Sequence, residues 1–254
     1  MDLDYIYNEL FDEDKRLHRS KASSIEFLTN SKYIKDCLIP RAKILDIGAG
    51  TGAYSIYFAQ LGYDVTSVEP VKKNLDCLKA KVKDSYLLKP YLGNALDLSM
   101  FADGVFDVVL NMGPLYHLKT EEERIKAIRE AVRVCKKGGK IFFAYISNDM
   151  VFVTESLFYN PRFLRSGEYY HQTFKVKDEP FTFLTPAYIS ELMIRLGYQE
   201  YKHFASDGLG ELLEERINAL SDEDFNEWLR FHFYTCEKKE MLGASHHLMY
   251  VIEK

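Results

Sequence analysis

The sequence predicts an α/β fold in which a mostly parallel, doubly wound sheet is covered by helices. Three observations predict it. Short β-branched or aliphatic runs alternate with longer helical patterns from residue 43 to about residue 146. A glycine-rich turn, LDIGAGTG, follows the first run, and an acidic residue, Glu69, ends the second. In open α/β sheets, ligands bind outside the carboxyl ends of the strands, so the binding site is expected at that edge.

Within this block, the apolar runs and the helical patterns define the expected elements. Strands are expected at Lys43–Ile47, Asp64–Val68, Ser85–Lys89, Phe106–Asn111 and Lys140–Ile146. Helices are expected at about Ala53–Leu61, Val71–Val82 and Glu121–Cys135, with Gly138 and Gly139 as the pair that stops the last helix. The connection GNALDLSMFADG, residues 93–104, is expected to be mostly loop.

The segments on either side of this block extend one domain over residues 1–254. Residues 1–40 are expected to form a helical N-terminal cap that ends at Pro40. One helix carries Leu3, Tyr7, Leu10 and Phe11 on one face, and another lies around Ser23–Leu28. Residues 41–147 form the expected cofactor-binding core. Residues 148–180 continue the alternation poorly and are expected to be an insertion.

The C-terminal part, residues 181–254, is expected to complete the sheet. A helix from Thr185 or Pro186 to Leu196 has Thr185 as a candidate cap and Gly197 as its stop. A strand near Tyr198–Phe204 and a last strand at His247–Ile252 follow. Between them, a helical insertion at about 209–234 contains two patterns, Leu209–Leu220 and Asp222–Tyr234.

Composition excludes several classes of protein. With 47% hydrophobic and 28% charged residues, the chain has the composition of a soluble globular protein. No apolar run approaches the length of a membrane span, and the first 20 residues lack the apolar stretch of a signal peptide. The net charge of −5 argues against a broad nucleic-acid surface. The cysteines, Cys37, Cys77, Cys135 and Cys236, lie far apart and show no metal-ligand spacing, so neither a disulfide framework nor a zinc site is expected. This fits a protein of the reducing cytoplasm.

The glycine turn and Glu69 together indicate a nucleoside-bearing cofactor. Glycines let the backbone approach a ligand closely, and the start of the following helix offers unpaired amides. An acid at the end of the second strand can accept hydrogen bonds from both hydroxyls of a ribose. NAD(P) remains an alternative because Gly48, Gly50 and Ala53 satisfy the GxGxxA pattern. Asp46, however, would repel a pyrophosphate and would suit an ammonium or sulfonium group.

These motifs resemble those of the class I S-adenosylmethionine-dependent methyltransferases. The matching stretches are LDIGAGTG (45–52), VEP (68–70), GNALDL (93–98) and FDVVLNMGPLYHL (106–118). The resemblance implies a Rossmann-like seven-stranded sheet whose last strand is antiparallel and forms a hairpin with the sixth. It covers residues 40–147 strongly and residues 181–254 more loosely.

The resemblance also implies roles for individual residues toward S-adenosylmethionine. Asp46 and the turn at Gly48, Ala49, Gly50 and Gly52 would hold the methionyl part. Glu69, with Pro70 after it, would bind the ribose, and Asn94 and Ala95 would flank the adenine, although many relatives have an acid in place of Asn94. Asn111 and Met112 would face the cofactor near its methyl group.

The acceptor side of the site is less well defined by the sequence. His117, with Tyr116 beside it in GPLYHL, is the leading candidate for a catalytic polar group; the alternative is a histidine that only packs or caps the loop. His171, His246 and His247 are weaker candidates, and because side chains alternate along a strand, at most one of the last two is expected to point inward. The fourth strand ends in Asn-Met-Gly-Pro and lacks the Asn/Asp-Pro-Pro-aromatic tetrapeptide of many methyltransferases that modify amino groups of nucleic acids or protein glutamine.

The insertion at 148–180 is rich in aromatic residues: Phe152, Phe158, Tyr159, Phe163, Tyr169, Tyr170 and Phe174. These residues are expected to form a lid over a small-molecule acceptor, or else the surface of a homodimer or a subsidiary aromatic core. Arg16 and Arg19 are expected on a solvated basic face.

The sequence therefore predicts methyl transfer from S-adenosylmethionine to a small molecule, at oxygen or nitrogen rather than carbon, with S-adenosylhomocysteine as the other product. Two alternatives stay open at this point. One is an NAD(P)-dependent oxidoreductase, and the other is a noncatalytic protein that binds S-adenosylmethionine.

Overall fold

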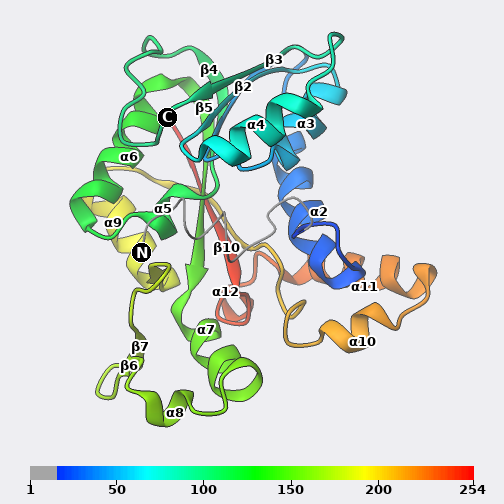
Figure 1. Cartoon of the computed structure of the whole chain (residues 1–254), viewed down its shortest axis with the longest axis vertical. Coiled ribbons are helices and arrows are strands. Elements are labelled where there is room, and N and C mark those ends of the chain that lie inside the picture. Colours follow the sequence, from blue (N-terminus) through cyan, green and yellow to red (C-terminus); the bar gives the residue numbers. More distant parts are fainter. Residues whose placement is uncertain (1–15) are drawn as a thin grey trace.

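The computed structural model describes residues 16–254. The expected helix that carries Leu3, Tyr7, Leu10 and Phe11 lies outside these residues. The structure is built around one large sheet whose strand order is β3-β2-β1-β4-β5-β10-β9 (Figure 1). Its strands are β1 (Lys43–Ile47), β2 (Asp64–Glu69), β3 (Leu88–Leu92), β4 (Phe106–Asn111), β5 (Cys135–Ser147), β9 (Glu200–Ala205) and β10 (His247–Glu253). The mostly parallel, doubly wound α/β fold is confirmed.

The sheet has the expected antiparallel last strand and one further short strand. β10 is antiparallel to both of its neighbours, β5 and β9, while β1 to β5 pair in parallel. The two-residue strand β8 (Phe183–Leu184) pairs in parallel with the end of β5, where Ile146 is opposite Phe183. Because β10 runs the opposite way, its first residue lies at the edge where β1, β4 and β5 end.

Helices cover both faces of the sheet (Figure 1). One face carries α2 (Lys21–Asp36), α3 (Ala53–Gln60) and α4 (Lys72–Lys81), and the other carries α6 (Glu121–Val134) and α9 (Pro186–Arg195). Thr120 and Glu123 form a capping box that starts α6, and the Thr185 hydroxyl accepts from the Tyr188 amide at the start of α9, as expected for a cap. Each helical layer packs on its own apolar cluster, so residues that alternate along a strand belong to different clusters.

Two sequence expectations about strands need correction, one at β3 and one at β5. β3 begins at Leu88 rather than Ser85, because the Tyr86 amide donates to Lys83 O and closes a turn there. Pro90 is tolerated within β3 because this strand is the sheet edge. Gly138 and Gly139 do not stop a helix: α6 ends at Val134, and both glycines lie in β5. A Cβ at Gly139 would lie 2.7 Å from Asp107 O, so this position serves close approach of two backbones.

The expected helix at Leu209–Leu220 is also shorter than predicted. Only α10 (Glu214–Asn218) is helical there, followed by α11 (Asp222–Thr235) and the short α12 (Lys239–Leu242). The first residues of that stretch form turns instead. Gly208 has a positive φ of 54°, and a Cβ at Gly210 would lie 2.8 Å from Asp207 O.

Residues 148–180 form a separate group of small elements beyond the carboxyl end of β5 (Figure 1). They comprise α7 (Asn148–Thr154), the π-helical turn η2 (Glu155–Tyr159), α8 (Phe163–Ser166) and the hairpin of β6 (Tyr169–Tyr170) and β7 (Lys175–Val176). The Phe152 ring contacts Phe163, Tyr169 and Phe174 edge-on, with centroids 5.0 to 5.6 Å apart. The insertion thus contains a subsidiary aromatic core, while Phe158, Tyr159, Tyr170 and Phe174 are exposed.

The chain returning from the insertion is tied to the turn that follows β4. This turn is the short helix α5 (Pro114–His117). The Thr182 amide donates to Tyr116 O at 2.7 Å, and Lys119 Nζ donates to Asp178 O and Pro180 O.

Among the helices of residues 16–254, none combines the length and the apolar character that a membrane span requires.

Candidate cofactor and acceptor site

The glycine turn between β1 and α3 is held in a backbone conformation that favours glycine. Gly48, Gly50 and Gly52 have φ values of 73°, 55° and 92°. The amides of Gly48 and Ala49 both donate to Val68 O, at 2.8 and 3.2 Å, which fixes the turn against β2. A Cβ at Gly52 would lie 2.2 Å from Leu78 Cδ1 of α4. The turn therefore requires glycine for its backbone conformation and, at Gly52, for packing.

Asp46 is a buried carboxylate directly before this turn. It is 2% exposed, and its Oδ2 accepts a hydrogen bond from the Ser55 hydroxyl at 2.6 Å. Ser67 Oγ lies 2.7 Å from Ser55 Oγ, and because Ser55 has only one hydroxyl hydrogen, Ser67 is the donor in that bond. Burial raises the pKa of Asp46 to about 6, and the nearby Glu69 carboxylate adds to the increase. A cationic group bound here would relieve both effects.

Glu69 ends β2 and orders the glycine turn through backbone amides. Its Oε2 accepts from the Gly50 amide at 2.8 Å, and its Oε1 accepts from the Val71 amide at 2.9 Å. The side chain is 3% exposed. Asn74 Nδ2 also donates to Oε1, at 3.5 Å. A carboxylate oxygen carries two lone pairs, and the contact of Glu69 with the hydroxyls of a ribose stays a prediction. Pro70, the next residue, is exposed.

The loop after β3 presents Asn94 and Ala95 differently. Asn94 is exposed, and its Oδ1 accepts from the Leu96 amide at 2.8 Å, which closes a tight turn. Ala95 is buried, at 6% exposure, and packs in the cluster below α6. The loop is therefore ordered by its own side chain, and the adenine contact proposed for these residues stays a prediction.

Asn111, the last residue of β4, is the most unusual polar group in the site. It is fully buried, and neither its amide nitrogen nor its carbonyl oxygen has a hydrogen-bond partner within residues 16–254. Leaving buried polar atoms unpaired costs about 1–3 kcal/mol each, so such a side chain calls for a partner. In the sheet, Asn111 lies opposite Ile47, one residue before Gly48. A ligand seated on the glycine turn is well placed to supply that partner.

Gly113 and α5, which follow Met112, pack directly on the glycine turn. A Cβ at Gly48 would lie 3.1 Å from Pro114 Cδ. A Cβ at Gly113 would lie 3.6 Å from Gly48 O and 3.6 Å from the Tyr116 hydroxyl. Tyr116 donates its hydroxyl to Met112 O at 3.0 Å. The two candidate catalytic residues thus belong to a turn that touches the candidate cofactor site.

His117 is an imidazole held in an apolar, aromatic setting. Its ring contacts Tyr116 and Phe181, with centroids 4.8 and 5.2 Å apart. Burial lowers the pKa of His117 to about 4, and the Lys119 cation contributes. The ring is neutral at pH 7, which a general base requires. Its catalytic role remains a prediction.

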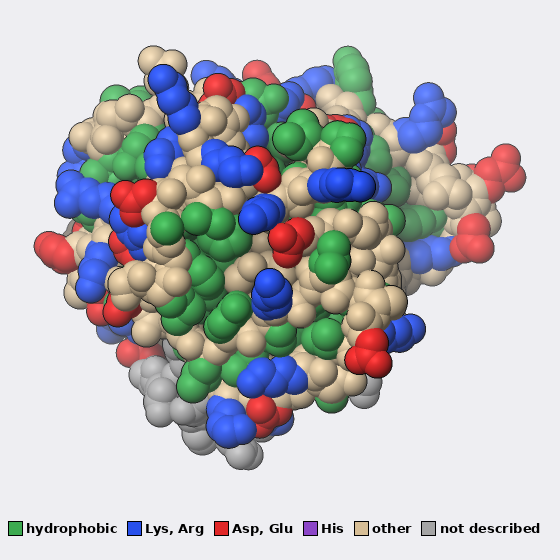
Figure 2. Space-filling model, turned by 90° about the horizontal axis from the view of Figure 1, so that it is seen from above, with side chains coloured by type: hydrophobic (Ala, Val, Ile, Leu, Met, Phe, Trp, Pro, Cys, Tyr) green, Lys and Arg blue, Asp and Glu red, His purple; other side chains and the backbone are tan. Residues whose placement is uncertain are grey.

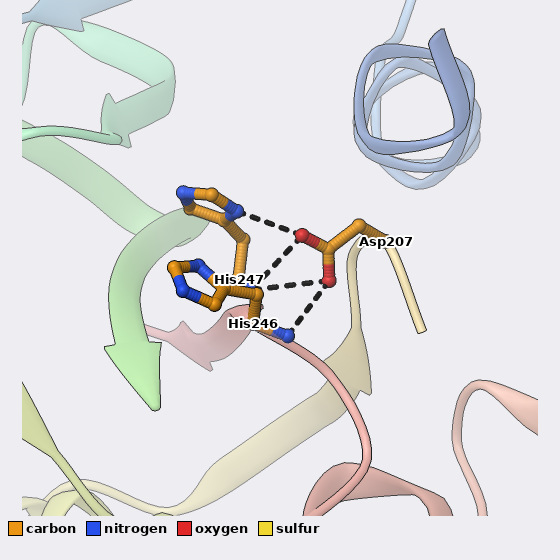
Figure 3. Close-up of side chains that lie close together, drawn as sticks. All are labelled: Asp207, His246 and His247. Atoms are coloured by element: carbon orange, nitrogen blue, oxygen red, sulfur yellow. Dashed lines mark hydrogen bonds and ion pairs between the residues drawn. The ribbon is translucent and has the colours of Figure 1, made fainter. Parts of the chain in front are cut away.

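Sequence reasoning named His246 and His247 as weaker candidates but missed the polar cluster that they form with Asp207 at the start of β10. Asp207, after β9, lies beside His246 and His247, and one ligand-type atom from each of the three residues falls within 4.8 Å of the others (Figure 3). The expectation that at most one of the two histidines points inward is wrong, because β10 begins at His247 and strand alternation does not apply to His246. His171 is exposed on the insertion. The pattern gave no signal for Asp207, whose partners lie 38 to 40 residues away.

Arg16 departs from the expected solvated face, whereas Arg19 fits it. Arg16 is partly buried and donates to Glu26 at 2.6 Å. Arg19 is two-thirds exposed and pairs with Glu214 at 3.2 Å, which fits the prediction. Arg16 is therefore part of the neighbourhood of His247, whose Nδ1 lies 3.7 Å from Glu26 Oε2.

The sheet order, the antiparallel last strand and the glycine turn matched by a buried acid define the class I methyltransferase fold. Residues 45–143 match the family model described as a methyltransferase domain. Residues 45–143 therefore contain a methyltransferase domain, and the fold of the chain is the Rossmann-like fold of the class I S-adenosylmethionine-dependent methyltransferases.

Curated relatives match less than half of the chain. A putative methyltransferase, YqeM, of Bacillus subtilis is 32% identical over 114 residues, which is 44% of this chain and 46% of the relative. A ubiquinone biosynthesis O-methyltransferase of Rhizobium leguminosarum is 31% identical over 123 residues, 48% of each chain. The chain thus spans about half the length of the curated relatives it matches.

Solved structures match over nearly the full chain but at low identity. A methyltransferase of Thermotoga maritima, described as a possible histamine N-methyltransferase, has a TM-score of 0.60 at 18% identity and covers 99% of both chains. A methyltransferase of Archaeoglobus fulgidus has a TM-score of 0.59 at 14% identity and covers 95% of this chain and 98% of that one. At such identities the likeness shows the fold.

Proposed function

We propose that the protein transfers the methyl group of S-adenosylmethionine to a small-molecule acceptor, at oxygen or nitrogen rather than carbon. The observation that carries this proposal is the buried Asp46 carboxylate, with its raised pKa, directly before the glycine turn. A buried negative charge at this position favours a ligand with ammonium and sulfonium groups and disfavours the pyrophosphate of NAD(P). The unpaired Asn111 amide gives independent support.

The residues present fit this cofactor. Asp46 and the turn at Gly48, Ala49, Gly50 and Gly52 would hold the methionyl part, Glu69 and Pro70 the ribose, and Asn94 and Ala95 the adenine. Asn111 and Met112 would lie near the methyl group. S-adenosylmethionine, when bound, supplies a methyl carbon already activated by a positively charged sulfur.

With the methyl group already activated, the protein's main task is to align the acceptor and exclude water. Holding two reactants in line can contribute on the order of 7–11 kcal/mol. Tyr116 and His117, on a turn that touches Gly48, are the residues proposed to face the acceptor. For a hydroxyl acceptor, the neutral His117 imidazole could take the proton, which typically accelerates such a step by about 10² to 10⁴.

A small-molecule acceptor is also favoured over nucleic acid. Nucleic-acid surfaces need clustered cations that displace counterions from phosphates. Figure 2 shows one face of the molecule, where Lys and Arg side chains are spread among hydrophobic and acidic side chains rather than gathered in one field.

The cysteines are all free, which fits the cytoplasmic location proposed for the protein.

Calorimetry with three ligands tests the cofactor. We expect S-adenosylmethionine and S-adenosylhomocysteine to bind and NAD to show no binding. Binding of NAD without a response to the other two would favour the oxidoreductase alternative and overturn the proposal.

A screen of methyl transfer tests the reaction. Radiolabelled S-adenosylmethionine and a library of metabolites that includes phenols, carboxylic acids and amines should reveal label in one class of acceptor. Cofactor binding with no transfer to any class would favour the noncatalytic alternative.

A further inference from the structure

The junction between β9 and β10 contains a charged group that the cofactor site does not use. Asp207 Oδ1 accepts hydrogen bonds from the Ser245 hydroxyl at 2.6 Å and from the backbone amides of His246 and His247 at 3.0 and 3.1 Å. Its Oδ2 lies 2.7 Å from His247 Nδ1 (Figure 3). Four donors therefore hold a carboxylate that is only 8% exposed.

His247 is held between two carboxylates. Besides Asp207, Glu26 of α2 lies 3.7 Å from His247 Nδ1, and Arg16 pairs with Glu26 at 2.6 Å. The pKa of His247 is raised to about 9, because the attraction of Glu26 and Asp207 outweighs the cost of burial and the repulsion by Arg16. His246, adjacent, has a lowered pKa because of burial, and Glu211 lies 3.6 Å from its Nδ1. Near pH 7, His247 is thus an imidazolium with both ring nitrogens protonated.

The polar contacts of the His247 ring lie on one side, at Nδ1. In Figure 3 one ring nitrogen faces Asp207, and the other is turned away from it, on the side where the His246 ring also lies. Within residues 16–254, the polar contacts of the ring run through Nδ1. Nδ1–H donates to Asp207, so Nε2–H remains as a donor. A charge-assisted bond from such a donor to an anionic oxygen is about twice as strong as a neutral one.

This donor lies at the same edge of the sheet as the candidate methyl-transfer site. Asn111 pairs with Phe143, and His247 pairs with Ile146, three residues further along β5. Along the strands the two residues are offset by three positions, and across the sheet β5 lies between their strands, so their Cα atoms are about 14 Å apart. His247 and Asp46 also extend from the face that carries α2 and α3, as their contacts with Glu26 and Ser55 show. A separation of this size between Asn111 and His247 suits a small molecule that is methylated near Asn111 and contacts His247 with its other end.

A metal ion is a less suitable occupant of this cluster. Asp207, His246 and His247 have ligand atoms close enough to surround a cation. Both oxygens of Asp207, however, already accept hydrogen bonds, and His247 Nδ1 is committed to one of them. A cation would have to displace these donors, whereas an anion needs only the outward Nε2–H.

We propose that His247 anchors the acceptor by donating from Nε2 to a carboxylate of the acceptor, and that Asp207 orients the His247 ring for this contact. The acceptors would then be small organic acids whose carboxylate lies at the end remote from the methylated atom. This inference rests on the proposed function, because it assigns a residue to the acceptor of that reaction. His247 binds the acceptor, and Asp207 is a positioning residue.

The test uses three probes of similar size and different charge. Protein labelled with ¹⁵N at histidine is saturated with S-adenosylhomocysteine and titrated with benzoate, benzyl alcohol and benzylamine, while histidine resonances are followed by NMR. We expect benzoate to shift the Nε2 resonance of His247 and to bind about tenfold or more tightly than benzyl alcohol. Tighter binding of benzylamine, or no binding of benzoate, would overturn the proposal.

Two variants separate this role from a structural one. His247→Gln should remove the preference for benzoate and leave the affinity for S-adenosylhomocysteine unchanged, and Asp207→Asn should reduce the preference. His171→Gln, on the exposed hairpin of the insertion, is the matched control and should change neither. A benzoate preference that survives His247→Gln rejects the anchor.

Two further readouts keep the result decisive. If His247→Gln does not fold, the unmodified protein decides: a benzoate shift at a histidine other than His247 rejects the anchor. Calorimetry on the same sample separates the two levels of inference. Absence of S-adenosylhomocysteine binding would overturn the proposed function and this inference with it, whereas cofactor binding without a benzoate preference would overturn this inference alone.

Discussion

Asp46, which is proposed to bind the cofactor, lowers the stability of the folded protein when it is charged. The folded state keeps its proton up to about pH 6, whereas the ordinary value is 3.8, so the protein loses stability as the pH rises through this interval. A difference of this size corresponds to about 3 kcal/mol at most. The charge at Asp46 is therefore retained at the expense of stability, as expected for a residue that serves a ligand.

Substituting Asp46 by asparagine tests this trade-off. Asp46→Asn keeps an oxygen that accepts from Ser55, so we expect the free energy of unfolding to rise at pH 7.5 and the gain to shrink as the pH falls from 6 toward 3.8. Denaturant unfolding at several pH values measures the gain. Calorimetry should show weaker binding of S-adenosylmethionine; unchanged affinity would mean that Asp46 does not face the cofactor.

Glu69 is expected to bind the ribose while it orders the glycine turn. Loss of hydrogen bonds to a charged group typically costs about 1.5–3 kcal/mol, so Glu69→Ala should weaken binding of S-adenosylhomocysteine about 10- to 150-fold. Glu215→Ala, an exposed position on α10, is the control for the loss of a glutamate. If Glu69→Ala binds S-adenosylhomocysteine as tightly as the parent, the ribose assignment is wrong.

At the scale of elements, the junction of α3 and α4 depends on Gly52. Both Gly52 and Gly62 have positive φ, 92° and 87°, but only Gly52 has a neighbour, Leu78, within clash distance of an added Cβ. Gly62→Ala should cost about 1–2 kcal/mol for the backbone alone. Gly52→Ala should cost about 1–3 kcal/mol more because Leu78 must move. Equal losses in denaturant unfolding would show that the contact with α4 has no energetic weight.

The insertion has its own small core, so its stability can be changed separately. Phe152→Ala removes the ring that contacts Phe163, Tyr169 and Phe174. Because Phe152 is only partly buried, the loss of local stability should be smaller than the roughly 3–5 kcal/mol of a fully buried Phe. Hydrogen exchange should become faster within residues 148–176, with protection of β1 and β4 unchanged. Faster exchange across the whole sheet would instead mean that the insertion and the sheet unfold together.

For the whole molecule, a bound cofactor should raise the thermal midpoint. A ligand present at 100 times its dissociation constant stabilises the folded state by about 2.7 kcal/mol, and for a chain of 254 residues about 1 kcal/mol shifts the midpoint by 2–4 °C. We therefore expect a rise of about 5–11 °C with saturating S-adenosylhomocysteine and none with NAD, measured by thermal unfolding. A rise with NAD alone would contradict the cofactor assignment.

The sequence was informative where local pattern and tertiary structure agree. The bounds of β1 and β4 were predicted to the residue, because each is a buried apolar run with a polar residue, Asp46 or Asn111, two positions before a glycine. Gly138 and Gly139 misled because a pair of glycines signals a helix end locally, whereas here it serves contact between distant backbones. Asp207 was not predicted, because its role depends on Glu26 and His247, which only the folded chain brings near it.

The hydrogen bonds from Thr182 and Lys119 have a practical consequence for transplanting specificity between related proteins. Residues 178–182 connect the insertion to the strand β8. Their backbone is hydrogen-bonded to Tyr116 O and to the side chain of Lys119, both next to His117 in the sequence or close to it. A grafted segment that ends after the β7 hairpin, at Val176, would replace the aromatic core as a cassette and leave these bonds intact. A graft that extends to residue 182 would also exchange the backbone that supports α5, and would change the candidate catalytic turn without altering any residue in it.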